Sequence, residues 1–258
     1  MAGRLRRAAL GALGWTGALA LFGLRALAAA VRPPYEGREI VRQLYELGAR
    51  SAPLVAVAGF AVGVVLSMHT RASLERFGAE AMIPAGLALA LVRETGPLTT
   101  GLLLSGRIGA GIGAELGAMR VTEQIDALEA SAVDAFKYLV VTRVVACIVA
   151  VPLLTTVLNF AGMLGGWAAE AAIEGMSLRL YTRRAFALLE FDDYVPATLK
   201  TAVFGFIIAI VSSFLGYHAA QGTEGVGRAS TRSVVLSSIF IIVANVVLVK
   251  AIFVFLAD

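Results

Sequence analysis

The sequence predicts an all-α integral membrane protein, with an N-terminal helix at the membrane surface and five membrane-spanning helices. Apolar residues make up 59% of the 258 residues, charged residues only 16%, and the mean hydropathy is +0.82, which is typical of a protein that crosses the membrane several times. The apolar residues also gather into runs of membrane length. We expect one membrane domain over residues 1–258, with interfacial and cytoplasmic helices in 1–50 and five spans in 51–258.

Composition also excludes several classes of site. The single cysteine, Cys147, lies inside an apolar run, so neither a disulfide framework nor a cysteine-based metal site is expected. The pI near 9.5 does not indicate nucleic-acid binding, because the basic residues flank apolar spans and set membrane orientation instead. His69 and His218 are isolated from each other, and no serine has a plausible His/Asp set. We therefore predict neither a metal site nor a catalytic site.

The N-terminal segment, residues 1–31, fits two interpretations. Three arginines near its start precede an apolar stretch that ends in small residues, as in a secretory signal peptide. Arg25 interrupts that stretch just before the supposed cleavage site, and further basic residues follow Pro33-Pro34. Basic flanks on both sides suit a helix that lies in the interface with arginines at the headgroups. The interfacial helix is the favoured interpretation.

Hydropathy then places the five spans and their connectors. A polar connector with several acids and arginines is expected over 168–194, and a loop over 218–228. Lys200 and Lys250 are predicted to extend toward the membrane surface from span ends, and Asn245 to hydrogen bond between helices. The predicted spans are 53–68, 83–114, 136–167, 195–217 and 234–256.

The second predicted span is too long for a simple crossing. At 1.5 Å per residue it would reach roughly 48 Å, against a hydrocarbon core of roughly 30 Å. Pro97 predicts an interruption, because it cannot donate a hydrogen bond to the carbonyl of Arg93. Small residues recur at every fourth position after it and predict a ridge for close helix packing. They are Gly101, Ser105, Gly109, Gly113 and Gly117.

Arg93 and Glu94 are the first candidate functional residues. Glu94 lies roughly 16 Å into the span, near the membrane midplane, where ionisable groups are expensive and mark a partner or a polar cavity. One interpretation is an ion pair with a neighbouring helix. The favoured one is a substrate cavity formed with Pro97, because a purely structural pair does not need a broken helix.

A polar segment follows, over residues 115–135. Val121, Ile125, Leu128 and Ala132 recur at helical spacing, which predicts an amphipathic helix. An ordinary solvated connector would explain the charges, but the apolar stripe favours a coupling helix that docks into a groove on a cytoplasmic partner. Ser131-Ala-Val-Asp134 fits a capping box for the next helix.

Orientation follows from the basic residues. With the N-terminus inside, most of the 22 lysine and arginine residues fall in cytoplasmic segments, including the flanks of the 115–135 helix. The positive-inside rule therefore predicts a cytoplasmic N-terminus and an external C-terminus.

One long pattern resembles a known family, the MlaE-type permeases. The resemblance extends over nearly the whole chain and is least specific in the first 30 residues. Its central motif is Arg93-Glu-Thr-Gly-Pro-Leu-Thr-Thr-Gly101, Gly106-Arg-Ile-Gly109 and Ala114-Glu-Leu-Gly-Ala-Met-Arg-Val-Thr-Glu-Gln-Ile-Asp-Ala-Leu128, with further matches at Tyr138-Leu-Val-Val-Thr-Arg143 and Gly225-Val-Gly-Arg-Ala-Ser-Thr-Arg232.

The resemblance implies an ABC transporter permease that moves phospholipids between the inner and outer membranes of bacteria. Such permeases are homodimers in the inner membrane. They work with a separate P-loop ATPase, which binds ATP and Mg, with a periplasmic MCE-domain lipid-binding protein, and often with a STAS-domain subunit. No cofactor is expected in this chain. Arg93, Glu94 and Pro97 would lie at the lipid cavity. The residues that would contact the ATPase are Glu115, Arg120, Glu123, Gln124 and Asp126.

Two alternatives stay open at this point. Related permeases import other lipids, such as sterols, so the substrate is inherited from the resemblance. An intramembrane lipid-modifying enzyme with Glu94 as general base is the alternative from another class, and it lacks a visible second catalytic group at that depth.

Overall fold

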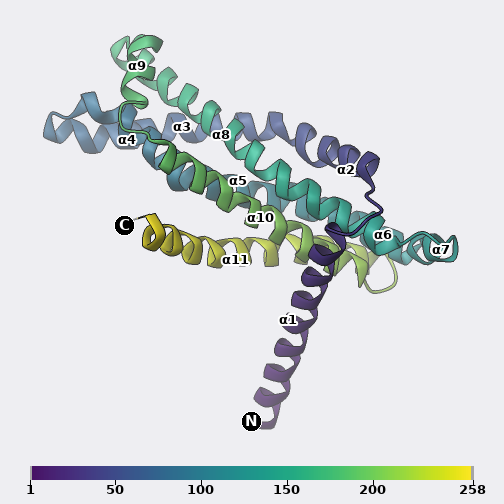
Figure 1. The fold of residues 1–258 in the computed structure, drawn as a ribbon. Helices are drawn as coiled ribbons and strands as arrows, with labels where there is room; N and C mark the ends of the chain where they lie inside the picture. Colours follow the sequence, from purple (N-terminus) through teal and green to yellow (C-terminus); the bar gives the residue numbers. More distant parts are fainter. Residues whose placement is uncertain (1, 257–258) are drawn as a thin grey trace. The chain divides into compact units, whose positions relative to one another are not determined.

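The computed structural model describes residues 2–256, and their regular elements are all helices (Figure 1). Six helical runs are long and apolar enough to cross a membrane, so the chain is a multi-pass membrane protein. The α-helices are α1 (Ala2–Ala30), α2 (Gly37–Gln43), α3 (Ala52–Leu74), α4 (Ile83–Ala90), α5 (Gly96–Leu104), α6 (Ala110–Val121), α7 (Gln124–Ala130), α8 (Thr142–Glu174), α9 (Leu178–Ala185), α10 (Phe191–Tyr217) and α11 (Thr223–Leu256).

The N-terminal helix α1 is one of these six runs, through its segment Leu13–Ala30. Its length and composition fit a helix that crosses the membrane as well as one that lies in the interface. Its predicted interfacial position therefore stays a prediction.

Several helices are longer than the predicted spans. The first span, predicted over 53–68, is part of α3, and α8 extends to Glu174 into the predicted polar connector. Helix α11 begins at Thr223 and includes part of the predicted loop 218–228. These boundaries were wrong because hydropathy marks the apolar core, whereas capping ends a helix. Gly78 and Gly175 have φ of 65° and 66°, the left-handed conformation that stops the helices before them.

The second run, Glu80–Val121, is interrupted as its length requires. Two π-helical turns, η5 (Leu91–Thr95) and η6 (Ser105–Gly109), separate α4, α5 and α6. The first lies directly before Gly96-Pro97, where the missing proline N–H disrupts the α-helical pattern. Single π turns inside α-helices often occur at functional sites. Two further π turns are η1 (Leu44–Gly48) and η7 (Lys137–Val141).

Contacts divide the chain into two compact units. The first consists of the residues up to Leu44, Ser105–Cys147 and Phe206–Ser237. Within it, Phe22 of α1 packs edge-on against Phe136 and Phe214, with ring centroids 5.0 and 5.4 Å apart. The guanidinium of Arg25 lies 4.2 Å from the Phe136 ring centroid. Aromatic and cation–π contacts therefore hold α1 in this unit.

The second unit consists of Tyr45–Leu104, Ile148–Gly205 and the residues from Ser238 onward. In it, α3 and α8 approach through glycines. A Cβ added at Gly63 would overlap the Gly162 carbonyl, and one at Gly165 would overlap the Phe60 carbonyl. A Cβ at Gly59 would lie 2.5 Å from the Leu158 carbonyl oxygen. Only glycine lets the two backbones lie this close, which is how membrane helices gain dispersion contact without a hydrophobic driving force.

A buried ion network joins the same two helices at their far ends. Arg71 of α3 donates to Glu170 and, at 2.7 Å, to Glu174 of α8, while the Ser67 hydroxyl donates to Glu170 at 2.7 Å. Glu170 is fully buried, so these donors stabilise its charge in the low-dielectric interior. The two glutamates, predicted to lie in a polar connector, are helical residues with a partner about 100 positions earlier.

Helix α9 packs on this part of the second unit. Ser177 caps it by accepting a hydrogen bond from the Leu180 N–H, and its Tyr181 is buried beside Ala88 and Met176. Burial, with a smaller contribution from the Glu170 charge, raises the pKa of the Tyr181 hydroxyl, so this side chain is neutral at physiological pH.

Candidate functional site

The charged residues Arg93 and Glu94 lie in the π turn η5 and have partners on two other helices of the second unit. Lys200 of α10 donates to Glu94 Oε2 at 2.7 Å and to the Arg93 carbonyl at 2.9 Å. Asn245 of α11 donates to Glu94 Oε1. Both carboxylate oxygens of Glu94 are therefore hydrogen bonded, and the three helices meet at one charge cluster.

The backbone of the π turn is part of this cluster. Because Pro97 has no N–H, the Arg93 carbonyl lacks its usual helical donor. The Lys200 ammonium donates a hydrogen bond to that carbonyl instead. Pro97 itself is buried and is not among the residues that line the adjacent cavity. Its contribution is to make a carbonyl available at the depth of Glu94.

A cavity of about 580 Å³ lies beside this cluster. Arg93 turns toward it and pairs with Asp193 of α10, with Nε donating to Oδ1 at 2.7 Å. Charges of both signs and apolar side chains thus line the same cavity, which suits a ligand with a charged head and an apolar tail. The lining residues are Arg93, Glu94, Glu190, Asp192, Asp193, Pro196, Ala197, Lys200, Val249 and Ile252.

The prediction for Lys200 was wrong. Its side chain is only 2% exposed and ends in the charge cluster, because α10 begins at Phe191 and so places Lys200 about 14 Å along the helix, too deep to reach the surface. The shared depth of Lys200 and Glu94 in their spans was the signal that could have paired them. The predicted bond between helices at Asn245 is confirmed, and Lys250 is exposed.

The small-residue ridge faces α10 and α11 in both units. In the second unit, Gly101 lies against Phe204 and Ile241. In the first unit, a Cβ at Gly113 would overlap the Ser233 hydroxyl of α11, and Gly117 lies against Val226 and Ala229 of the same helix. Gly109 faces Ser212 of α10, and Ser105 is buried.

The predicted coupling segment is not one helix over 115–130, and that prediction was wrong. Helix α6 continues to Val121, Glu123 adopts φ of 59°, and the short helix α7 then covers Gln124–Ala130. A left-handed residue cannot continue a right-handed helix, so Glu123 separates the two. On the far side of α7, Ala132 also has φ of 59°. Ile125 is fully buried, so the apolar stripe anchors α7 to its own unit.

The end of α7 also differs from the predicted capping box. The Ser131 hydroxyl donates back to the Ala127 carbonyl at 2.9 Å and so belongs to the end of α7. Asp134 alone caps the next helix, by accepting a hydrogen bond from the Lys137 N–H at 3.0 Å.

The five predicted coupling residues are distributed over both helices. Arg120 of α6 pairs with Asp126 of α7 at 2.7 Å across the break, and Gln124 donates to the Thr122 hydroxyl at 2.9 Å. Glu123 is exposed. Glu115 lies two turns earlier on α6 and pairs with Arg143 at 2.7 Å. The sequence pattern gave Arg143 no role beyond its place in the motif Tyr138–Arg143.

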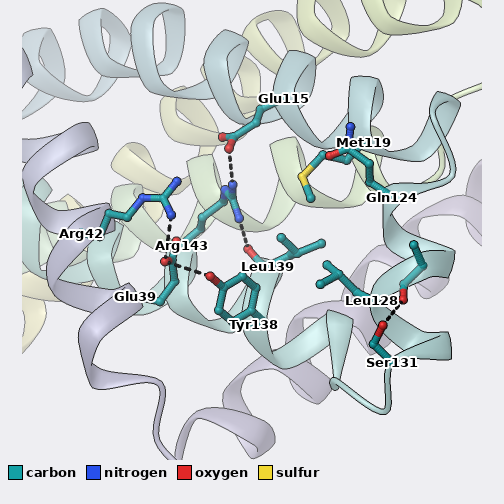
Figure 2. Close-up of a pocket in the computed structure, with 11 residues that line it drawn as sticks. Glu39, Arg42, Glu115, Met119, Gln124, Leu128, Ser131, Tyr138, Leu139 and Arg143 are labelled. Atoms are coloured by element: carbon teal, nitrogen blue, oxygen red, sulfur yellow. Dashed lines mark hydrogen bonds and ion pairs between the residues drawn. The ribbon is translucent and has the colours of Figure 1, made fainter.

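Figure 2 shows a pocket of the first unit that is lined by Glu115, Gln124 and Arg143 among others. Its volume is about 430 Å³, and residues of α2, α6, α7, η7 and α8 line it. On one side Glu39 of α2 accepts hydrogen bonds from Gln43 at 2.8 Å and from the Tyr138 hydroxyl at 3.2 Å. Glu39 also pairs with Arg42 at 3.4 Å, so this pocket holds two ion pairs, Arg42–Glu39 and Arg143–Glu115. Among residues 2–256, no group of three or more His, Cys, Asp or Glu residues could hold a metal ion.

Comparisons with known proteins agree on one family. The family model "Permease MlaE" matches residues 40–251. A probable ABC transporter permease of Rickettsia bellii is 39% identical over 237 residues, which are 92% of each chain. The chloroplastic protein TRIGALACTOSYLDIACYLGLYCEROL 1 of Arabidopsis thaliana is 34% identical over 82% of this chain and 60% of its own.

A third relative has a more specific name. The intermembrane phospholipid transport system permease protein MlaE of Haemophilus influenzae is 29% identical over 83% of this chain and 82% of its own. The family match covers most of the chain and includes both the charge cluster around Glu94 and the segment around α7. The chain therefore belongs to the MlaE permease family of ABC transporters.

Proposed function

We propose that this chain is the membrane subunit of a transporter that moves phospholipids between the inner and outer membranes of a bacterium. The observation that carries the proposal is the cavity beside Glu94, where Arg93, the buried Lys200 and several carboxylates line the same space as apolar side chains. A zwitterionic or anionic headgroup can exchange ion pairs with this cluster while the acyl chains stay on apolar surface. The name of the Haemophilus influenzae relative supports the choice of phospholipid.

The energy source in this proposal is a separate ATPase, which binds ATP and Mg and docks on α7 and the adjoining end of α6. The exposed side chains of Glu123, Gln124 and Asp126 supply the contact surface. A relative named as a probable ABC transporter permease supports an ATPase partner. A periplasmic MCE-domain protein, a second copy of this chain and a STAS-domain subunit complete the proposed assembly.

Glu94 is poorly arranged for the alternative role of general base. Both of its oxygens already accept hydrogen bonds from cationic or amide donors, so neither oxygen is left to receive a proton from a substrate. Transport thus explains the cluster better than enzymatic turnover does. A sterol has no charged headgroup that could exchange ion pairs with this cluster.

The decisive experiment is affinity purification of the tagged chain from its native membranes in mild detergent. We expect an ATPase to copurify and phospholipids to appear in native mass spectra, with less bound phospholipid in a Lys200→Met variant. A matched control is Lys250→Met, which changes an exposed lysine of α11. Purification of the chain without a nucleotide-hydrolysing partner, or with sterol as its bound lipid, would contradict the proposal.

The proposed orientation, with a cytoplasmic N-terminus in the inner membrane and a periplasmic C-terminus, has its own test. Cys147 is buried and is the chain's single cysteine, so a Cys147→Ala background accepts new reporter cysteines. A cysteine at Ala130 should react with a membrane-impermeant maleimide only in inside-out vesicles. Labelling in intact spheroplasts would reverse the topology.

A further inference from the structure

Among the first-unit residues whose side chains the structure describes, Arg143 in the first turn of α8 is the most deeply buried cation. Its side chain is 2% exposed. One guanidinium nitrogen donates to the Leu139 carbonyl in the π turn η7 at 2.7 Å, and another contacts Glu115 Oε1 of α6 at 2.7 Å (Figure 2). Because a buried charge is tolerated only when it is paired and hydrogen bonded, these contacts fix α6 and the start of α8 relative to each other.

These two helices flank α7 in the chain, and we call α6 and the start of α8 the arms of α7. Helix α6 precedes it and η7 with α8 follow it, while Glu123 and Ala132 interrupt the helical backbone on its two sides. A seven-residue helix between two breaks cannot transmit a force through continuous helical hydrogen bonds. Side-chain contacts between the arms must therefore carry that force.

The contacts around α7 differ in strength. Arg120 and Asp126 are 41% and 56% exposed, so water screens their pair and its contribution is small. Tyr217 of α10 donates to Glu129 at 3.1 Å, also at the surface. The Glu115–Arg143 pair has its cation almost fully removed from water and its geometry fixed by a second hydrogen bond. It is the stiffest of these connections.

We propose that Arg143 is a positioning residue that couples movement of α7 to α8 through its ion pair with Glu115. The inference rests on the proposed function, in which an ATPase docks on this segment. ATP-driven displacement of α7 with the end of α6 pulls on Glu115, and Arg143 passes the displacement to α8. Without the pair, the ATPase still binds α7 and hydrolyses ATP, but α8 does not follow.

The test uses the complete transporter reconstituted in liposomes, with three measurements: ATPase bound per permease, ATP hydrolysed, and lipid moved per ATP. We expect Arg143→Met to keep the ATPase bound while lipid moved per ATP falls roughly tenfold, the size of a typical coupling between linked sites, and Glu115→Gln to lower the same ratio. Arg143→Lys keeps the buried charge but not the planar fork, and should give an intermediate ratio. The control is Arg228→Gln, which breaks an exposed pair with Glu224 of the same unit.

Each outcome decides between alternatives. Arg143 would be a docking residue, and the proposal overturned, if its variants released the ATPase. The proposal would also fail if folded Arg143→Lys and Glu115→Gln complexes moved as much lipid per ATP as Arg228→Gln. Should Arg143→Met not fold, Arg143→Lys, which retains the charge, still gives the answer. A wild-type chain that binds no ATPase would instead refute the proposed function.

Discussion

Removal of Glu94 should lower the free energy of unfolding much more than removal of its partner Lys200. Lys200 is 2% exposed, whereas Glu94 is 44% exposed and borders the cavity. Glu94→Gln leaves a buried ammonium with only the Arg93 carbonyl and an amide oxygen as acceptors. Lys200→Met leaves a carboxylate that still accepts from Asn245 and can be hydrated from the cavity.

The structure gives the size of this asymmetry. An uncompensated buried charge costs about 3–5 kcal/mol, so Glu94→Gln should lower the free energy of unfolding by that amount. Loss of a hydrogen bond to a charged group that stays hydrated costs about 1.5–3 kcal/mol, which is the expectation for Lys200→Met. The double variant removes both charges and should be more stable than Glu94→Gln alone, because a buried pair replaced by neutral groups is nearly neutral.

The assay is reversible unfolding of the four proteins in the same mixed micelles, read as a double-mutant cycle. Asn245→Leu provides a control, because it removes a neutral donor to the same carboxylate. The reasoning would be refuted if the two single variants lost equal unfolding free energy, or if their losses simply added in the double variant. Either result would show that the buried Lys200 ammonium does not depend on Glu94.

Three further predictions concern packing, strain and ionisation. Gly63→Val should prevent α3 from packing on α8, because its Cβ meets the Gly162 backbone, and should lower the free energy of unfolding by more than the roughly 1–3 kcal/mol of ordinary overpacking. A Cβ at Gly111 meets nothing, so Gly111→Ala should stabilise α6 by about 0.5–1 kcal/mol. Thermal unfolding compares the two variants, and similar midpoints would contradict the close approach of α3 and α8. Ala132→Gly should stabilise the fold by up to about 1 kcal/mol by relieving a left-handed alanine, and a destabilised variant in the same unfolding assay would argue against that strain. Because burial raises the pKa of Tyr181, its contribution to stability should be intact below the unfolded-state pKa of about 10 and should decline as pH rises above it. Tyr181→Phe should flatten that decline. An unchanged slope of unfolding free energy against pH would show that Tyr181 does not cause the decline.

Much of the fold follows from hydropathy, because a backbone in lipid must satisfy its own hydrogen bonds and a long apolar run can do so only as a helix. The interruption near Arg93 also follows from the sequence, since Pro97 removes a specific donor and the span is longer than the membrane. The helix ends do not follow, because Gly78 and Gly175 act through backbone geometry that hydropathy does not record.

The candidate site was only half accessible from sequence. Glu94 stood out by depth alone, whereas Lys200 lies 106 positions away and becomes its partner only through helix packing. The break at Glu123 was missed for another reason. Left-handed positions usually contain glycine, and here glutamate adopts that conformation, so no residue type marked the end of α6.

The π turns impose a constraint on chain length. Lys200 donates a hydrogen bond to a carbonyl of η5, and Arg143 donates one to a carbonyl of η7, and both cations are buried. Deletion of one residue from Leu91–Thr95 would convert the turn to α-helix and remove the wider turn whose carbonyl Lys200 now bonds. Homologous chains should thus accept many substitutions in this turn but no insertion or deletion, while the segment between α10 and α11 remains free to vary in length.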